Sequence, residues 1–340
     1  MAVSPFSGVA DPGADPFHER SSTCFSLHKQ ILGGAIRFDS NSEALLELVG
    51  AAYGGLPEHR LPLNGPELHI ELRLAARQGT PNAAEPAPVI MQAGAGLLCG
   101  VMDSSNYAIV APAQSRALVV ASEDMLESPY HLRYELIEFA VFILAARALG
   151  LVPLHGACVG RHGRGVLLLG ASGSGKSTLA LCSLQQGLDF LAEDAVFVQP
   201  QSLLATGVAN YLHVRADALG FVDNDATRRW ITRSPIIRRR SGVQKFEADL
   251  RLGPGALAAN PLALISVVFV STQAADDPDE LLIPICRESM AARLRADQAY
   301  AAGQLAWPHF EERVMQLANY ELRRGAHPRA SAEALRRLLD

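Results

Sequence analysis

The chain has 340 residues, of which 49% are apolar and 19% charged, enough for one large domain or two ordinary ones with a substantial core. Its formal net charge of −5 gives no support for a protein that coats nucleic acid or binds a membrane surface. The five cysteines are scattered, without a CxxC pair or a zinc-like spacing to His, which is typical of reduced core thiols. We therefore expect a cytoplasmic protein.

The first 150 residues predict a tail followed by an α+β domain. Residues 1–22 are rich in Pro, Gly and Asp and lack the basic start and apolar core of a secretory signal, so we expect a flexible tail. The N-terminal domain is then expected over residues 23–150. Its predicted elements are a helix from Ser42 to Gly54 and strands within 24–37, 67–75, 88–94, 96–102, 106–112 and 117–122.

Short strands separated by frequent turn signals favour an antiparallel sheet in this domain. The apolar segment 130–150 predicts a buried helix that ends at Gly150, a favourable residue just after a helix. This segment contains Glu138 and Arg147, and it is too short and too charged to span a bilayer.

The pattern changes at the start of the second predicted domain, residues 151–340. The apolar runs LHGACVG and RGVLLLG are separated by Arg161-His162-Gly163, which predicts a β-hairpin. A glycine-rich segment follows directly, then a helix over 177–187, then the β-rich run LDFLAEDAVFV. Further on we expect a strand at 261–271, helices at 288–303, 308–318 and 330–339, and a strand or helix end at 316–324. The order of strand, glycine loop, helix and strand is that of a phosphate-binding βαβ unit.

The glycine-rich segment matches GxxxxGK[ST] at every fixed position. Glycines let consecutive N–H groups point at phosphate oxygens, and the following helix adds the positive end of its dipole. Lys176 would reach the β- and γ-phosphates, and the Ser177 hydroxyl would bind Mg²⁺. The sequence thus predicts binding of ATP with Mg²⁺ by Gly170, Ala171, Ser172, Gly173, Ser174, Gly175, Lys176, Ser177 and Thr178.

An acidic pair follows on the next β-rich run. An acid at such a position binds Mg²⁺ directly or through water, and in a kinase it can also take the proton from an acceptor hydroxyl. We predict both roles for Asp194 and a metal role for Glu193, although strand geometry would turn the two side chains in opposite directions. His155 begins the hairpin that leads to the glycine loop; it is either a packed residue or an active-site residue.

Residues 154–194 together resemble the core of the HPr kinase/phosphorylase family. In that family a His-Gly strand, a hairpin, a GxSGxGKS loop, a helix and a strand ending in two acids follow at similar spacing. The resemblance implies a phosphate-loop core of the HPr kinase and phosphoenolpyruvate carboxykinase type. It implies that Asp194 is the catalytic base toward a serine hydroxyl and that His155 is the active-site histidine.

Residues 213–223 (HVRADALGFVD) resemble a later RGLG-type segment of the family, with two residues inserted. Arg215 is the residue that matches, while His213 or Val214 stands where the family has a metal-binding Glu. The N-terminal 150 residues look more like those of HPr-kinase-related proteins found with peptide-modification systems. Some of those relatives phosphorylate a serine of a ribosomally made precursor peptide.

A basic segment, residues 228–245, holds six arginines and Lys245 without an acid. It is consistent with a solvated loop or an oligomer contact, and equally with a mobile cover that brings positive charge to a triphosphate or an acidic peptide. We name Lys245 and Arg215 as groups that would neutralise charge during transfer. The segment has no nucleic-acid motif, and Trp230 is its only aromatic residue.

These features predict an ATP-dependent kinase that transfers the γ-phosphoryl group to a hydroxyl, favouring a serine of a protein or precursor peptide. Two alternatives remain open at this stage. One is a kinase of a free small molecule, and the other is a non-catalytic ATP-binding sensor or scaffold. We expect neither nucleic acid nor membrane as a partner, and a homo-oligomer stays open.

Overall fold

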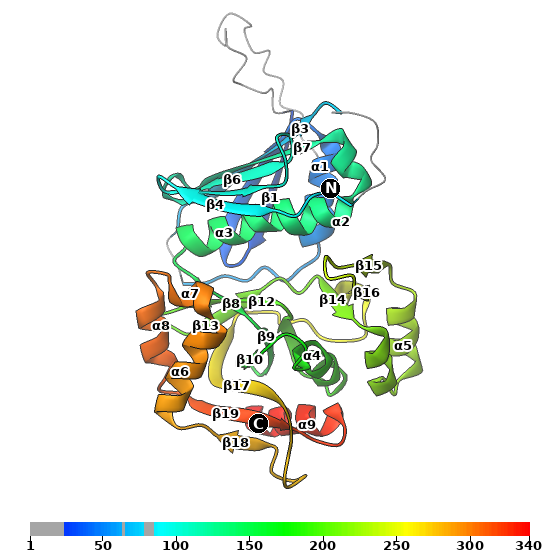
Figure 1. Cartoon of the computed structure of the whole chain (residues 1–340), viewed down its shortest axis with the longest axis vertical. Coiled ribbons are helices and arrows are strands. Elements are labelled where there is room, and N and C mark those ends of the chain that lie inside the picture. The colour runs from blue at the N-terminus through cyan, green and yellow to red at the C-terminus, as the bar shows by residue number, and fades with distance from the viewer. Residues whose placement is uncertain (1–23, 63–64, 78–84) are drawn as a thin grey trace, which may run out of the picture. The chain divides into compact units, whose positions relative to one another are not determined.

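The computed structural model describes residues 24–62, 65–77 and 85–340, so the predicted tail at 1–22 lies outside the described residues. The protein is a mixed α/β chain that divides into two compact units (Figure 1). The first unit comprises Met1–Gly54 and Pro62–Leu149, and the second comprises Gly55–Leu61 and Gly150–Asp340. Segment 55–61, which the sequence placed in the N-terminal domain, thus packs with the second unit. In the part of the chain that is described, no helix is both long and apolar enough to cross a membrane.

The first unit is built on a seven-stranded sheet with the strand order β1-β2-β3-β7-β6-β5-β4. Leu68, Ile70 and Leu72 of β3 are buried and alternate with more exposed residues, so one face of the sheet carries the core. Helices α1 and α3 pack on the sheet. The elements are β1 (Phe25–Ile31), β2 (Gly34–Ser40), α1 (Glu43–Tyr53), β3 (Leu68–Ala75), β4 (Ile90–Gly94), β5 (Leu97–Val101), β6 (Tyr107–Ala111), β7 (Arg116–Ser122), α2 (Pro129–His131) and α3 (Glu138–Ala148).

The prediction of an antiparallel sheet was wrong for the central strand β3. β3 runs parallel to both β2 and β7, while the remaining pairs are antiparallel. The β2–β3 pair is parallel because α1 carries the chain from the end of β2 back to the start of β3, and such a crossover yields parallel strands. The apolar helix is present as predicted, with a π-helical stretch at Leu132–Ile137 ahead of α3. Gly150 follows it with a φ of 64°, as expected for a residue that ends a helix.

The second unit is built on a nine-stranded mixed sheet. Its main path is β11-β9-β10-β17-β13-β12-β8, and β19 pairs with both β17 and β18. The strands are β8 (Val152–His155), β9 (Ala157–Arg161), β10 (Arg164–Leu169), β11 (Asp189–Ala192), β12 (Ala195–Gln199), β13 (Leu204–Gly207), β17 (Leu262–Ala274), β18 (Leu282–Pro284) and β19 (Ala318–Arg324). The predicted hairpin is confirmed as β9–β10, with His162 and Gly163 at φ values of 54° and 75° in its turn.

Helices cover both faces of this sheet, which explains why β10 is apolar at nearly every position. Val166 and Leu168 lie in one core with residues of α4 (Lys176–Gln185) and α9 (Pro328–Leu339). Leu167 lies in a second core with residues of α6 (Arg287–Asp297), α7 (Ala299–Ala302) and α8 (Trp307–Val314). A strand buried on both faces reads as a continuous hydrophobic run.

The β-rich run 188–198 is two strands rather than one. β11 pairs with β9, whereas β12 pairs with β13 and β8. Glu193 and Asp194 occupy the bend where the chain passes from one set of partners to the other. Segment 316–324, left open between strand and helix, is strand β19.

A small antiparallel sheet with the order β14-β16-β15 completes the second unit. Its elements are β14 (Tyr211–Val214), a 3₁₀ helix at Ala216–Phe221, α5 (Asp225–Thr232), β15 (Ile236–Arg238) and β16 (Gln244–Asp249). The basic segment is therefore largely α5 and the β15–β16 hairpin rather than a loop. Its arginines are compatible with regular structure because most of them are exposed, while Ile231 of α5 and Ile237 of β15 are buried.

Candidate active site

The glycine-rich segment forms a tight loop between β10 and α4. Gly170 has a φ of 133°, and a Cβ atom at this position would lie 2.8 Å from the carbonyl oxygen of Val270. Gly175 has a φ of 103° and precedes the first turn of α4. Both conformations are ones that glycine adopts readily, so the sequence pattern follows from the path of the backbone. The loop delivers the N-terminus of α4 to the surface of a cavity.

Lys176 is buried and folds back over this loop. Its ammonium group donates hydrogen bonds to the carbonyl oxygens of Gly170 and Ala171. Burial lowers the pKa of Lys176, against the opposing influence of the carboxylates of Asp297 and Asp194. A cation held within such a loop is in place to meet an anion that reaches the loop amides.

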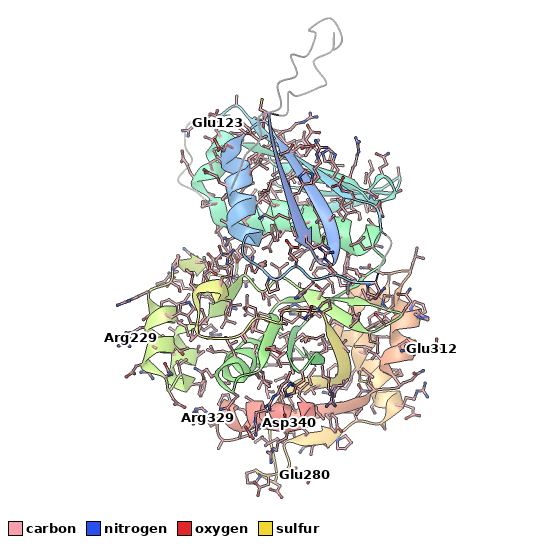
Figure 2. All side chains as sticks on the ribbon, turned by 180° about the vertical axis from the view of Figure 1, so that it is seen from behind. Glu123, Arg229, Glu280, Glu312, Arg329 and Asp340 are labelled. Atoms are coloured by element: carbon pink, nitrogen blue, oxygen red, sulfur yellow. The ribbon has the colours of Figure 1, made fainter. Side chains whose placement is uncertain are left out.

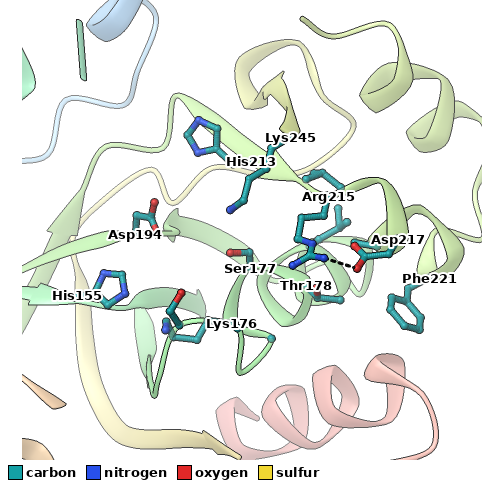
Figure 3. Close-up of a pocket in the computed structure, with 16 residues that line it drawn as sticks. His155, Lys176, Ser177, Thr178, Asp194, His213, Arg215, Asp217, Phe221 and Lys245 are labelled. Carbon is teal, nitrogen blue, oxygen red and sulfur yellow. Dashed lines mark ion pairs between the residues drawn. The ribbon is translucent and has the colours of Figure 1, made fainter. Parts of the chain in front are cut away.

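A cavity of about 300 Å³ opens in front of the loop and draws its walls from separate parts of the second unit (Figure 3). Ser177 and Thr178, at the start of α4, face the same space as Asp194 from the β11–β12 bend. Other walls come from β8, β14, the 3₁₀ helix and β16. Of the predicted site residues, those lining this cavity are His155, Ser172, Gly173, Gly175, Lys176, Ser177, Thr178, Asp194, Arg215 and Lys245.

Asp194 is held by a partner that the sequence did not single out. Its Oδ2 atom accepts a hydrogen bond of 3.0 Å from Nη2 of Arg239, which follows β15. Burial would raise the pKa of Asp194, but the Arg239 guanidinium, helped by His213 and Lys245, holds it below its ordinary value. About half of the Asp194 side chain stays exposed, at 48%. The carboxylate is therefore ionised near neutral pH and accessible from the cavity.

Glu193 contacts His213 rather than the cavity, and strand alternation is not the cause, because the two acids lie in a bend. One of its oxygens accepts a 2.8 Å hydrogen bond from the backbone N–H of His213, while the other has no hydrogen-bond partner among the described residues. Glu193 is buried and does not line the cavity. The proposed metal role of this residue therefore stays a prediction.

His213 is the second site residue that the sequence did not assign. Its ring lies between Glu193 and Glu247, with nitrogen–oxygen distances of 3.6 and 3.7 Å, and Nη2 of Arg239 lies 3.2 Å from its Nδ1 atom. Burial would lower the pKa of His213, but hydrogen bonds and charge from the two glutamates outweigh this and raise it. In the sequence, His213 stood out only as a residue at or next to the position where the HPr kinase family has a Glu. That comparison gave no indication of its partners Glu193, Glu247 and Arg239.

His155 lies at the end of β8, opposite Ala195 on β12 and thus next to Asp194. Gln298 fixes its backbone, because the Gln298 amide accepts from the His155 N–H at 2.8 Å and donates to its carbonyl at 2.9 Å. The imidazole itself faces the cavity in Figure 3.

The two cations named from the sequence occupy different walls. Lys245 projects from β16 into the cavity, and Arg215, beyond β14, pairs with Asp217 at 3.0 Å. Three members of the predicted loop set do not line this cavity: Gly170, Ala171 and Ser174. Across residues 24–62, 65–77 and 85–340, no group of three or more His, Cys, Asp or Glu side chains is arranged to hold a metal ion.

No protein-family model matches the sequence, and comparison with curated proteins found no match. Among solved structures, the chain is similar in part to that of the HPr(Ser) kinase/phosphatase from Coxiella burnetii. The alignment has 13% sequence identity and a TM-score of 0.27, and it covers 55% of this chain and 87% of that chain. So low a TM-score assigns neither a detailed fold nor an activity to this chain, whose function has to be read from its own residues.

Proposed function

We propose that this chain is an ATP-dependent kinase that transfers the γ-phosphoryl group to a hydroxyl, most simply that of a serine in a protein or precursor peptide. The observation that carries the proposal is one cavity in which Lys176, the start of α4 and the accessible Asp194 carboxylate face each other. These are the groups that phosphoryl transfer requires for holding phosphates and for accepting a proton.

The donor side rests on the glycine loop. Its N–H groups and the N-terminus of α4 favour phosphate oxygens, and the Lys176 ammonium would exchange the carbonyls of Gly170 and Ala171 for the β- and γ-phosphates. Lys245 and Arg215 face the same space and would neutralise charge that develops on the transferred group.

The acceptor side rests on Asp194. Its carboxylate would accept the proton of the acceptor hydroxyl while the hydroxyl oxygen bonds to the γ-phosphorus. The bond between that phosphorus and the bridging oxygen breaks, and ADP leaves. The low pKa of Asp194 keeps it ionised for this role, and Arg239 keeps it oriented. His155 lies beside the carboxylate and would contact the acceptor.

The residues in the cavity also fit Mg²⁺, which prefers one or two carboxylates, a hydroxyl and water to a full set of protein ligands. The Ser177 hydroxyl and the Asp194 carboxylate would hold it, and Glu193, one of whose buried oxygens has no hydrogen-bond partner among the described residues, is the further candidate. The ion supplies charge neutralisation of the phosphates when it is bound.

The test is mass spectrometry of candidate precursor peptides and of a protein extract after incubation with the chain, ATP and Mg²⁺. We expect a serine to gain one phosphoryl group. Asp194→Asn should keep ATP affinity within a few-fold, because the glycine loop, Lys176 and Ser177 still hold the phosphates and the ion. It should lower the rate of transfer by about 10²–10⁴-fold, because an amide cannot accept the proton of the hydroxyl.

Three other results would redirect the assignment. Transfer by Asp194→Asn at the normal rate would contradict the role of the base. Loss of ATP binding together with transfer would assign Asp194 to metal binding instead. ATP binding without any phosphorylated protein or peptide would favour a small-molecule acceptor or a nucleotide sensor.

A further inference from the structure

A second cavity, of about 280 Å³, lies on the far side of the glycine loop within the same unit. Its walls are the ends of β17 and β19, the turn at 325–327, the start of α9 and the 3₁₀ helix. None of the residues assigned so far to transfer, namely His155, Lys176, Asp194, Arg215 and Lys245, lines it. This second cavity has no role in the transfer mechanism proposed above.

The two cavities share part of their lining at the glycine loop. Gly173, Gly175, Thr178, Asp217 and Phe221 line both of them. In Figure 3, Phe221 and Asp217 lie on the opposite side of Ser177 from Asp194 and His155. A ligand with its phosphates at Lys176 therefore has a direct path for its remaining part into the second cavity.

The charge of the second cavity differs from that of the first. The first is lined by three cations, Lys176, Arg215 and Lys245. The second is lined by Arg323 and Arg324, of which Arg323 pairs with Asp276 at 2.7 Å, with Glu321 3.7 Å away. Lys176 and Ser177 line the first cavity alone, so the phosphates are expected there, and the second is left for the remaining part of the same molecule.

The chemistry of the second cavity suits a base and a sugar. Phe221, Val270 and Leu322 supply apolar and aromatic surface, and Ser271, Thr272 and Ser331 supply hydroxyls. Ligand sites of this kind combine apolar walls with a few polar groups that fix orientation. An aromatic ring at the mouth can also stack on a base.

The rim of the cavity is held in place by contacts between its walls. The Phe221 ring meets the His327 ring edge-to-face at 5.3 Å between centroids, and Arg329 pairs with Asp223 at 2.9 Å. Arg329 lies near the beginning of α9, whose end is followed by Asp340 (Figure 2). These contacts tie the 3₁₀ helix and the residues after it to the turn at 325–327 and the start of α9, which are walls of the cavity.

We infer that this second cavity holds the nucleoside part of the phosphoryl donor, base and ribose, while the glycine loop and first cavity hold the phosphates. The inference rests on the proposed function and adds to it the residues that would select a nucleotide over an inorganic polyphosphate as donor. An acceptor peptide is a poorer occupant, since its hydroxyl must reach Asp194, which lines the first cavity alone.

The test compares MgATP with magnesium tripolyphosphate, which carries the phosphates but no nucleoside, by calorimetric titration of the full chain. The wild type should bind MgATP at least tenfold more tightly. Ala326→Trp and Thr272→Trp fill the cavity from two different walls and should each weaken MgATP at least tenfold, leaving tripolyphosphate affinity within about twofold. Ala259→Trp places the same side chain at an exposed site outside both cavities and should bind like the wild type.

Lys176→Ala separates failure of the inference from failure of the proposed function, because it should weaken both ligands. A wild type that binds neither ligand would overturn the proposed function itself. Equal wild-type affinity for the two ligands, or tryptophan variants that bind MgATP normally, would overturn only the nucleoside assignment. Variants with normal MgATP affinity but a raised KM for the acceptor would place the acceptor in this cavity instead.

Discussion

At the scale of single residues, the pair of Asp194 and Arg239 defines the charge state of the site. The pair is partly exposed, so its Coulomb energy is modest, of order 0.2–1 kcal/mol for such contacts. Its chemical effect is clearer, since Arg239 holds the pKa of Asp194 below its ordinary value and so keeps the carboxylate ionised at acidic pH.

Arg239→Gln should therefore make transfer more sensitive to acid. Without the guanidinium the pKa of Asp194 rises, so the base becomes protonated at a higher pH than in the wild type. We expect kcat/KM to fall about two- to fivefold at neutral pH or above and further as the pH falls, measured as a pH–rate profile.

The matched control is Arg238→Gln, which removes the same charge from an exposed neighbour on the same hairpin. Its acidic limb should coincide with that of the wild type. An Arg239→Gln profile with an unchanged acidic limb would show that Arg239 does not set the ionisation of Asp194.

The sequence located most of the residues that face the cavity but not the contacts between them. Lys176, Ser177 and Asp194 were found because a short motif and the next β-rich run fix their neighbourhood. Arg239 was one of three consecutive arginines, about 45 positions from Asp194, and only the fold of the β15–β16 hairpin distinguishes it from its neighbours. His213 became recognisable only once β14 and β16 had brought it between Glu193 and Glu247.

At the scale of elements, the loop between β10 and α4 depends on how closely it approaches β17. Gly170 and Gly173 both have positive φ values, 133° and 83°, but only a Cβ at Gly170 would collide with backbone, the Val270 carbonyl. Around Gly173 nothing lies within 4 Å of the position of a Cβ.

Gly170→Ala should accordingly destabilise the protein more than Gly173→Ala. Strain from an unfavourable backbone conformation costs about 1–3 kcal/mol, and the collision at Gly170 adds to it. Urea unfolding of the two variants measures the difference, and nucleotide affinity should fall in the same order. Equal unfolding free energies would mean that the loop can move away from β17 at little cost.

The elements that the sequence predicted well are those with a strong local pattern. The β9–β10 hairpin has a His-Gly turn, and α4 and α9 have helical periodicity. The errors arose where partners decide the outcome. The parallel pairing of β3 with β2 and β7 and the break between β11 and β12 depend on contacts between distant segments, which a local pattern does not contain.

At the scale of the whole molecule, the second unit includes a segment from far earlier in the chain. His59 of that segment is buried, and its two ring nitrogens lie 2.8 Å from the Thr206 hydroxyl and the Ala258 carbonyl. Burial lowers the pKa of His59, although the hydrogen bond to the Ala258 carbonyl opposes this. The neutral form is therefore the one that the fold accommodates.

This burial predicts a loss of stability in acid. Because the folded-state pKa of His59 lies below its unfolded value of about 6.5, the unfolded chain binds the proton more readily. The contribution of His59 is full above pH 6.5 and declines as the pH falls toward the folded-state pKa, by at most about 1.4 kcal/mol at one unit below 6.5. Urea unfolding at pH 8.0 and pH 5.5 measures it.

His59→Leu should be less stable than the wild type at pH 8.0, by about 1–3 kcal/mol, because it leaves the Thr206 hydroxyl and the Ala258 carbonyl without this partner. Its unfolding free energy should, however, fall less between pH 8.0 and 5.5. The exposed His162→Leu is the control and should keep the wild-type dependence. Parallel pH curves for wild type and His59→Leu would refute the assignment.

The early position of segment 55–61 in the chain also limits how the gene can recombine. The chain passes between its two units three times, at 54–55, 61–62 and 149–150. A gene fusion made with a single breakpoint near codon 150 would transfer the second unit without the seven residues 55–61 that pack with it. To move the second unit into another gene intact, recombination has to transfer both residues 55–61 and residues 150–340. We therefore expect the two units to be inherited together.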